Sequence, residues 1–181
     1  MSNLFVSFEG GPILVGPAGS LESWRGIQAG DYESLCALFD ADQSLKATSV
    51  PGHEGDCIAV DFGGPGTVRV IRNGMSLVLI RAWHEDPDSD AVYTDALSAE
   101  ETSSPHVGEV DFAGDTIVIA WAAEALAAIP ASVSEPSVPN IDVAVDGSVL
   151  LHPLKKGRYR WRRSEINLPS GSLVRLVFDP Q

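Results

Sequence analysis

The side chains best suited to metal or acid–base chemistry are four histidines: His53, His84, His106 and His152. No two of them are spaced as in H-x-H or H-E-x-x-H, the short patterns that turn two imidazoles toward one metal ion. We therefore expect histidines in surface loops and no metal ligands. His84, with Glu85 and Asp86 after it, is the nearest approach to a ligand cluster. One functional hypothesis is therefore a small metal- or ligand-binding β protein, or an enzyme, that uses the His84/Glu85 region. We keep it as the alternative to the binding function described below.

The candidate nucleophiles lack surroundings that would activate them. Cys36 falls on the apolar side of an expected helix, which indicates a core thiol. Ser20, Ser23 and Ser34 do not stand in a nucleophile elbow. The glycine-rich run 63–66 contains proline and is not followed by Lys-Ser/Thr, so it predicts a β turn rather than a phosphate cradle. We expect no catalytic residues, no cofactor and no enzymatic activity.

Charge is distributed unevenly along the chain. The formal net charge is −13, which argues against a nucleic-acid partner. Six of the twelve basic residues lie in the run 155–163, where Arg158, Arg160 and Arg162 would share one face of a strand. With the aromatic residues between them they could form a strip that binds anions or RNA. We favour the simpler interpretation, in which these arginines pair with the acidic excess of the protein itself.

A second block, 85–101, is acidic and contains no basic residue. Its carboxylates are Glu85, Asp86, Asp88, Asp90, Asp95, Glu100 and Glu101. Apolar residues recur at helical spacing within it, at Val92, Tyr93, Ala96 and Leu97, which predicts an amphipathic helix over 90–101. The acidic side of this helix is either solvated surface or a docking face for a basic protein.

The length of 181 residues predicts a single domain, 1–181, with a substantial core. No apolar run approaches the ~20 residues of a membrane helix, and we expect no membrane association. From residues 1–5 we expect no secretion signal, and Cys36 and Cys57 suit free thiols in a reducing compartment. The expected location is cytoplasmic.

Short apolar runs separated by glycine and proline predict a mainly β fold. We expect an antiparallel sandwich or a curved sheet with one or two short helices packed on it, and an α+β fold as the alternative. The predicted strands cover 4–8, 13–15, 45–50, 57–62, 67–72, 75–83, 107–112, 116–121, 141–145, 157–163 and 173–178. Hairpins are expected between 4–8 and 13–15, between 107–112 and 116–121, and around Asn73-Gly74. Helices are expected over 32–39, 90–101 and 122–129.

The stretch from Glu9 to Leu38 concentrates the turn and packing signals. Gly10, Gly11 and Pro12 predict a sharp turn. Asp31 stands where a helix N-cap is expected. Trp24 lies between strand and helix, where one large ring could cover both.

The chain resembles the immunity protein 21 family of bacterial polymorphic toxin systems. The resemblance runs from Phe5 to Phe178, with longer loops around 63–66 and 131–139. It rests on GGPILV from Gly10, on the Trp24-x-Gly26 corner, and on Asp31, Tyr32 and Cys36. Further along, Arg81-Ala82-Trp83, the acidic helix and Gly157-Arg158-Tyr159-Arg160 follow in similar order.

The resemblance implies a protein that binds and occludes a cognate toxin, which our charge analysis predicts to be basic. It also implies structural roles for seven motif residues: Gly10, Gly11, Pro12, Trp24, Gly26, Asp31 and Tyr32.

Overall fold

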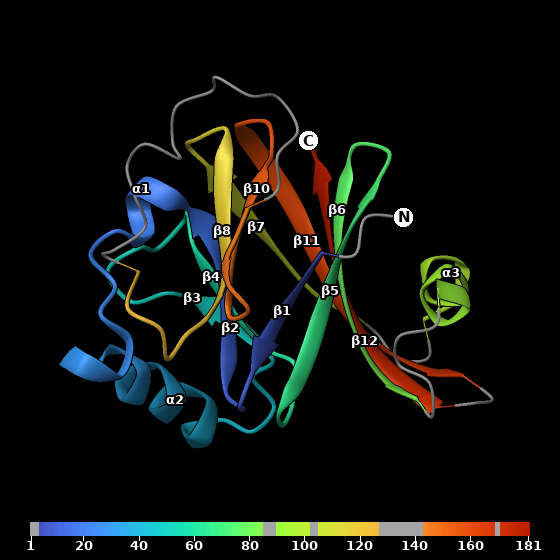
Figure 1. The fold of residues 1–181 in the computed structure, drawn as a ribbon, viewed down its shortest axis with the longest axis horizontal. Helices are drawn as coiled ribbons and strands as arrows, with labels where there is room; N and C mark the ends of the chain where they lie inside the picture. The colour runs from blue at the N-terminus through green and yellow to red at the C-terminus, as the bar shows by residue number, and fades with distance from the viewer. Residues whose placement is uncertain (1–3, 85–89, 102–104, 127–142, 169–170) are drawn as a thin grey trace.

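The computed structural model describes residues 4–84, 90–101, 105–126, 143–168 and 171–181 (Figure 1). Its strands are β1 (Leu4–Phe8), β2 (Pro12–Pro17), β3 (Ala47–Ser49), β4 (Ile58–Asp61), β5 (Gly66–Asn73), β6 (Ser76–His84), β7 (His106–Phe112), β8 (Thr116–Trp121), β9 (Val143–Asp146), β10 (Val149–Pro153), β11 (Gly157–Leu168) and β12 (Gly171–Pro180). Its helices are α1 (Ala18–Leu21), the 3₁₀ helix η1 (Gly26–Ala29), α2 (Asp31–Ala41) and α3 (Asp90–Ser98).

The strands form two six-stranded antiparallel sheets. Sheet A has the order β1-β5-β6-β12-β11-β7, and sheet B has the order β3-β4-β2-β8-β10-β9. The two sheets lie against each other with one shared core, to which Val6 and Leu176 of sheet A and Ile13 and Ile119 of sheet B all contribute. The predicted mainly β fold, with short helices packed on antiparallel sheets, is confirmed.

A helix covers the outer face of each sheet (Figure 1). On sheet B, Leu35 of α2 packs in a second apolar cluster with Leu14 of β2. On sheet A, Tyr93 and Ala96 of α3 pack in a third cluster with Ile80 of β6. The apolar stripe predicted for the second helix is therefore the side that faces the sheet.

Two of the predicted hairpins are wrong. β1 pairs with β5 in sheet A, whereas β2 lies in sheet B. In the same way β7 belongs to sheet A and β8 to sheet B. The short links 9–11 and 113–115 cross from one sheet to the other, and positive φ angles at Gly10 and Gly11 allow the first crossing. Alternating side chains indicate a strand, but they do not indicate which sheet receives it.

The third hairpin is confirmed with a shifted turn. β5 pairs with β6, and Asn73 stands opposite Ser76, so Gly74 and Met75 form the two-residue loop. We predicted Asn73 and Gly74 at the tip. Gly74 has a φ of 62°, and it therefore supplies the positive φ that a tight hairpin requires.

The remaining predictions of secondary structure are mostly right in type and shifted at the ends. Strand β10, which lies between the predicted strands 141–145 and 157–163, was missed. Of the predicted helix 122–129, the described residues up to Leu126 form a turn, and the others lie outside the described ranges. No helix among the described residues is both long and apolar enough to cross a membrane.

Candidate binding face

The amino-terminal end of α3 is tied to sheet A by an arginine. Arg69 of β5 donates a hydrogen bond from Nη2 to Asp90 Oδ1 at 2.5 Å, and its guanidinium lies 4.3 Å from the centre of the Tyr93 ring. The hydrogen bond and the positive charge of Arg69 lower the pKa of Asp90 below its ordinary value. Asp90 is therefore an anchoring carboxylate, although much of its side chain is exposed.

The carboxyl-terminal end of α3 is held by another arginine of sheet A. Nη1 of the buried Arg175 on β12 donates to the carbonyl oxygens of Ala96 at 2.7 Å and Ala99 at 3.1 Å. Glu101 lies 3.5 Å from Arg175 and 3.7 Å from Arg162. A cation at this end also complements the helix dipole. Glu101 is therefore neutralised by the sheet.

These contacts divide the seven predicted docking carboxylates. Asp90 and Glu101 are paired with sheet arginines, so the fold supplies the bases that the acidic segment itself lacks. Asp95 and Glu100 are exposed, and within the described ranges neither forms an ion pair. The other three, Glu85, Asp86 and Asp88, lie outside the described residues.

An exposed aromatic ring lies on the same face of sheet A. Phe5 is 50% exposed and stands directly across from Arg69 in the β1–β5 pair. Its neighbours Val6 and Leu4 point into the core, so Phe5 points to the outer side of the sheet, where Arg69 meets α3. The sequence offers one signal for the exposed Phe5 ring, namely an apolar residue at an outward position of β1, and we did not predict this site from it. We call Phe5, Asp95 and Glu100 together the α3 face.

The glycine pair of the resemblance motif lies beneath Tyr32 of α2. The Gly10 carbonyl accepts hydrogen bonds from Tyr32 Oη at 3.3 Å and from Trp121 Nε1 at 2.6 Å. A Cβ at Gly11, whose φ is 79°, would lie 2.4 Å from the Tyr32 hydroxyl, so a side chain there would strain the backbone and displace the tyrosine ring. Burial is the main cause that raises the pKa of Tyr32 to about 12.

Trp24 and Gly26 meet the segment that follows β8. The Trp24 indole donates to the Ala122 carbonyl at 2.8 Å, and the ring is 4% exposed. A Cβ at Gly26, whose φ is 59°, would lie 2.1 Å from the Ala123 carbonyl oxygen. The Pro12 carbonyl accepts a hydrogen bond from the Ala122 backbone N–H at 3.0 Å. These motif residues meet at one junction between β2, the start of α2 and the end of β8.

The expected N-cap of α2 is wrong by one residue. Gly30, with a φ of 78°, occupies the N-cap, and Asp31 is the first helical residue. The Asp31 carboxylate instead accepts a hydrogen bond from the Arg25 backbone N–H at 2.7 Å, which fixes the chain entering the helix. Glycine tolerates the left-handed conformation at this position, so the aspartate is free to bind the preceding turn.

The glycine-rich run 63–66 is held by Arg81 of the Arg-Ala-Trp motif. Arg81 donates hydrogen bonds to the carbonyl oxygens of Phe62 at 2.9 Å and Pro65 at 2.6 Å, and also to that of Gly64. Its guanidinium stacks on Trp83 at 4.0 Å from the ring centre. The loop thus turns carbonyl oxygens toward a cation, whereas a phosphate cradle would present N–H groups to an anion.

The basic strand β11 shows the predicted alternation. Arg158 and Arg160 are exposed, whereas Tyr159 and Trp161 belong to the core between the sheets. The aromatic rings are therefore unavailable for stacking on nucleobases, and the nucleic-acid strip loses its basis. Acidic residues stand across from the arginines, with Asp111 opposite Arg158. Arg162 also forms a 3.1 Å ion pair with Asp179, as expected if these bases pair with the protein's own acids.

We expected the histidines in surface loops, but three of the four lie in strands. His152 is buried in β10 and His106 is exposed in β7. His84 ends β6, and its predicted partners Glu85 and Asp86 lie outside the described residues. Both cysteines are free thiols, as predicted. Among the described residues, a different histidine, His53, lies close to Asp56 and Cys57.

Comparisons with protein-family models, with characterised proteins and with solved structures find no match for this chain.

Proposed function

We propose that this protein is an immunity protein, which binds a cognate bacterial toxin and blocks the toxin's working surface without catalysing a reaction. The observation that carries the proposal is a pair of exposed carboxylates, Asp95 on α3 and Glu100 two residues beyond its end, on a helix fixed to a β sandwich at both ends. The resemblance to the immunity protein 21 family supports the same function, and a cytoplasmic location would suit it.

Charge supports a basic toxin as the partner. The chain has a formal net charge of −13. Because Asp90 and Glu101 pair with sheet arginines, the carboxylates without an ion pair in the described segment 90–101 are the exposed Asp95 and Glu100. Opposite charges accelerate and orient encounter more than they add to final affinity. Asp95 and Glu100 would therefore guide the toxin onto the α3 face.

Phe5 would supply the apolar contact that keeps the toxin bound. Interface affinity is concentrated in a few residues, and aromatic side chains are enriched among them. Phe5 exposes half of its surface on the outer side of sheet A, where a partner that covers α3 could also bury it. Arg175 and Arg69 fix the helix before binding, so little ordering cost remains for the encounter.

The test begins with the toxin encoded by the gene next to the one for this chain. That toxin is expressed in a sensitive bacterium with and without this protein, and growth is measured. We expect protection by the wild type, and weaker protection and faster dissociation for Phe5→Ala. Leu38→Ala is the matched control, because Leu38 is an exposed apolar residue of α2, on the side of sheet B. Failure of the wild type to protect or to bind the toxin would reject the proposal.

A further inference from the structure

The loop between β3 and β4 folds back on itself and brings three ligand-type side chains together. The His53 carbonyl accepts hydrogen bonds from the backbone N–H groups of Asp56, at 3.4 Å, and Cys57, at 3.2 Å. Gly55 has a φ of 101°, which allows the sharp reversal. The loop ends are joined by a 3.2 Å hydrogen bond from Val50 N–H to the Cys57 carbonyl.

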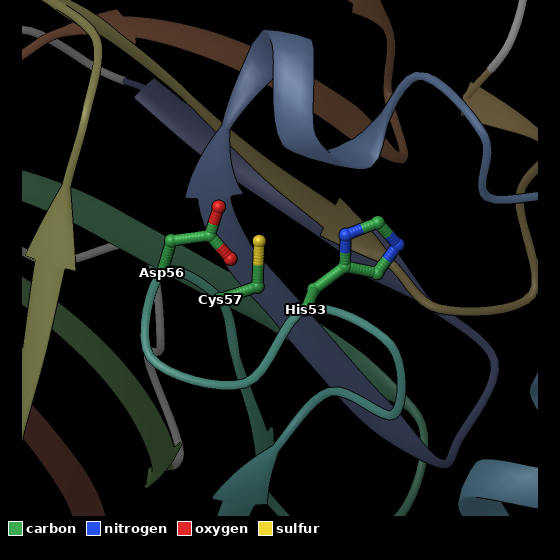
Figure 2. Close-up of side chains that lie close together, drawn as sticks. All are labelled: His53, Asp56 and Cys57. Atoms are coloured by element: carbon green, nitrogen blue, oxygen red, sulfur yellow. The ribbon is translucent and has the colours of Figure 1, made fainter.

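One donor atom from each of His53, Asp56 and Cys57 lies within 4.8 Å of the other two. Figure 2 shows one ring nitrogen of His53 turned toward the Cys57 sulfur and the other turned away. Within the described residues, Oδ1 of Asp56 is buried and accepts no hydrogen bond from an N–H or O–H group. A buried carboxylate oxygen without such a partner is costly, and a cation would satisfy it.

Ser20 of α1 and Ser23, two residues after this helix, orient the outer atoms of these side chains. Ser20 Oγ donates a hydrogen bond to Asp56 Oδ2. Ser23 Oγ lies 3.4 Å from His53 Nε2, so that nitrogen can keep its proton while Nδ1 faces the cluster. Metal-binding histidines commonly donate their second N–H to a polar group, and metal-binding carboxylates are themselves hydrogen-bonded.

The neighbouring strand leaves room for the sulfur. A Cβ at Gly16 of β2 would lie 2.3 Å from Cys57 Sγ, so the sulfur occupies the space that a side chain at position 16 would take. Cys57 is fully buried, which does not suit a nucleophile that must reach a substrate. Ser23, rather than an aspartate, lies beside the outer nitrogen of His53, so the three residues do not form a catalytic triad.

We infer that His53, Asp56 and Cys57 bind one divalent metal ion with the ligand preferences of zinc. Imidazole nitrogen, carboxylate oxygen and thiolate sulfur are the three donor types that zinc accepts, whereas magnesium and calcium select oxygen. Three protein ligands leave a fourth tetrahedral position for water. The carboxylate of Glu54 is not part of this group of donor atoms, and it accepts a 3.0 Å hydrogen bond from the Gly52 N–H instead.

Binding requires a small contraction of the loop and the loss of one proton. Zinc–ligand bonds of about 2.0–2.3 Å place tetrahedral donor atoms roughly 3.3–3.8 Å apart. The three donor atoms of the loop lie within 4.8 Å of one another, so they would move closer together on binding. Cys57 releases its thiol proton to solvent as the metal–sulfur bond forms. The loop has glycine on both sides of His53, at positions 52 and 55, which suits such an adjustment.

The experiment titrates the metal-free, reduced protein with zinc in competition with a coloured chelator, and then with cobalt. We expect one equivalent of zinc to bind, and the cobalt complex to show the ultraviolet charge-transfer band of a thiolate ligand. His53→Gln and Cys57→Ser should each weaken zinc binding at least tenfold. His106→Gln and Cys36→Ser are the matched controls, because they remove the same groups elsewhere, and both should bind as the wild type does.

If Cys57→Ser folds poorly, the melting temperatures of the other variants with and without zinc provide a second measurement. Zinc should raise the melting temperature of the wild type and of His106→Gln, but not that of His53→Gln. Absence of stoichiometric binding, a cobalt complex without the thiolate band, or equal affinity in His53→Gln and the wild type would each overturn the inference. The assay uses no toxin, so its outcome is independent of the proposed immunity function.

Discussion

Arg69 and Arg175 hold opposite ends of the same helix. Arg69 binds Asp90 in the first turn of α3, and Arg175 binds the carbonyl oxygens and the glutamate at its end. Both arginines come from sheet A, and both side chains are buried against it. The helix is short, so its own hydrogen bonds would not keep it formed alone. Its position on the sheet therefore depends on this pair of cations together with its apolar side.

Replacing Arg175 with methionine should destabilise the protein by about 1.5–3 kcal/mol, the range for hydrogen bonds to a charged group. The variant loses the bonds to Ala96 and Ala99 and leaves Glu101 with one arginine instead of two. Arg160→Met on the adjacent strand is the control, and it should change stability by less than about 0.5 kcal/mol because its side chain is exposed. Urea unfolding measures both, and equal midpoints would contradict the anchoring role.

Trp24→Ala should cost roughly 3–5 kcal/mol, the range for truncating a buried large aromatic residue. The ring is 4% exposed, and its indole N–H binds the Ala122 carbonyl, which would lose its partner. Ile27→Ala, three residues later and 55% exposed, should be nearly neutral. Denaturant midpoints give the comparison. An unchanged midpoint for Trp24→Ala would make this residue a candidate for surface contacts instead.

Gly26→Ala should destabilise the protein more than Gly30→Ala does. Both glycines have positive φ, so both variants carry the backbone strain of about 1–2 kcal/mol. At Gly26 the new Cβ would also meet the Ala123 carbonyl oxygen, whereas nothing lies within 4 Å of it at Gly30. Overpacking of this kind adds about 1–3 kcal/mol. Equal unfolding free energies for the two variants would show that the Gly26 contact relaxes without cost.

Tyr32 should make stability fall in alkaline solution. Its folded-state pKa is raised from 10.0 to about 12, so the folded chain holds the phenolic proton more tightly than the unfolded chain. The resulting stabilisation is complete below pH 10 and is lost as the pH rises to 12. We expect the difference in unfolding free energy between wild type and Tyr32→Phe to be constant below pH 10 and to shrink above it. Parallel stability curves across this interval would refute the shift.

Asp95→Asn with Glu100→Gln should slow association with the basic toxin several-fold at low salt. Dissociation should change much less, because exposed charges mainly guide the encounter. The difference should fade as ionic strength rises and the Debye length shrinks below about 10 Å. The control is Glu33→Gln with Asp40→Asn on α2, which removes the same charge from the side of sheet B. Similar slowing in both double variants would indicate net charge rather than a local face.

The sequence by itself determined most of the segments that become strands and the two longer helices. Alternation in β1 and in β11, and the helical spacing around Tyr93, are local patterns that each segment carries along its own length. The free thiols were likewise predictable from a chain with only two cysteines. The β hairpin at Gly74 was predictable because Asn-Gly between two apolar runs is a local hairpin signal. The sequence also placed Tyr159 and Trp161 on the side of β11 opposite Arg158 and Arg160, and the structure shows that this side is buried.

Only the tertiary structure decided how these elements are paired and which charges remain free. An alternating strand fits either sheet equally well, so the crossing of the chain between β1 and β2 and between β7 and β8 left no local signal. Arg69 and Arg175 are outside the α3 segment in sequence, and their pairing with it depends on the order β5-β6-β12 in sheet A. The cluster of His53, Asp56 and Cys57 likewise needed the folded loop and the gap at Gly16, because a backbone reversal, rather than regular spacing, brings the three side chains together.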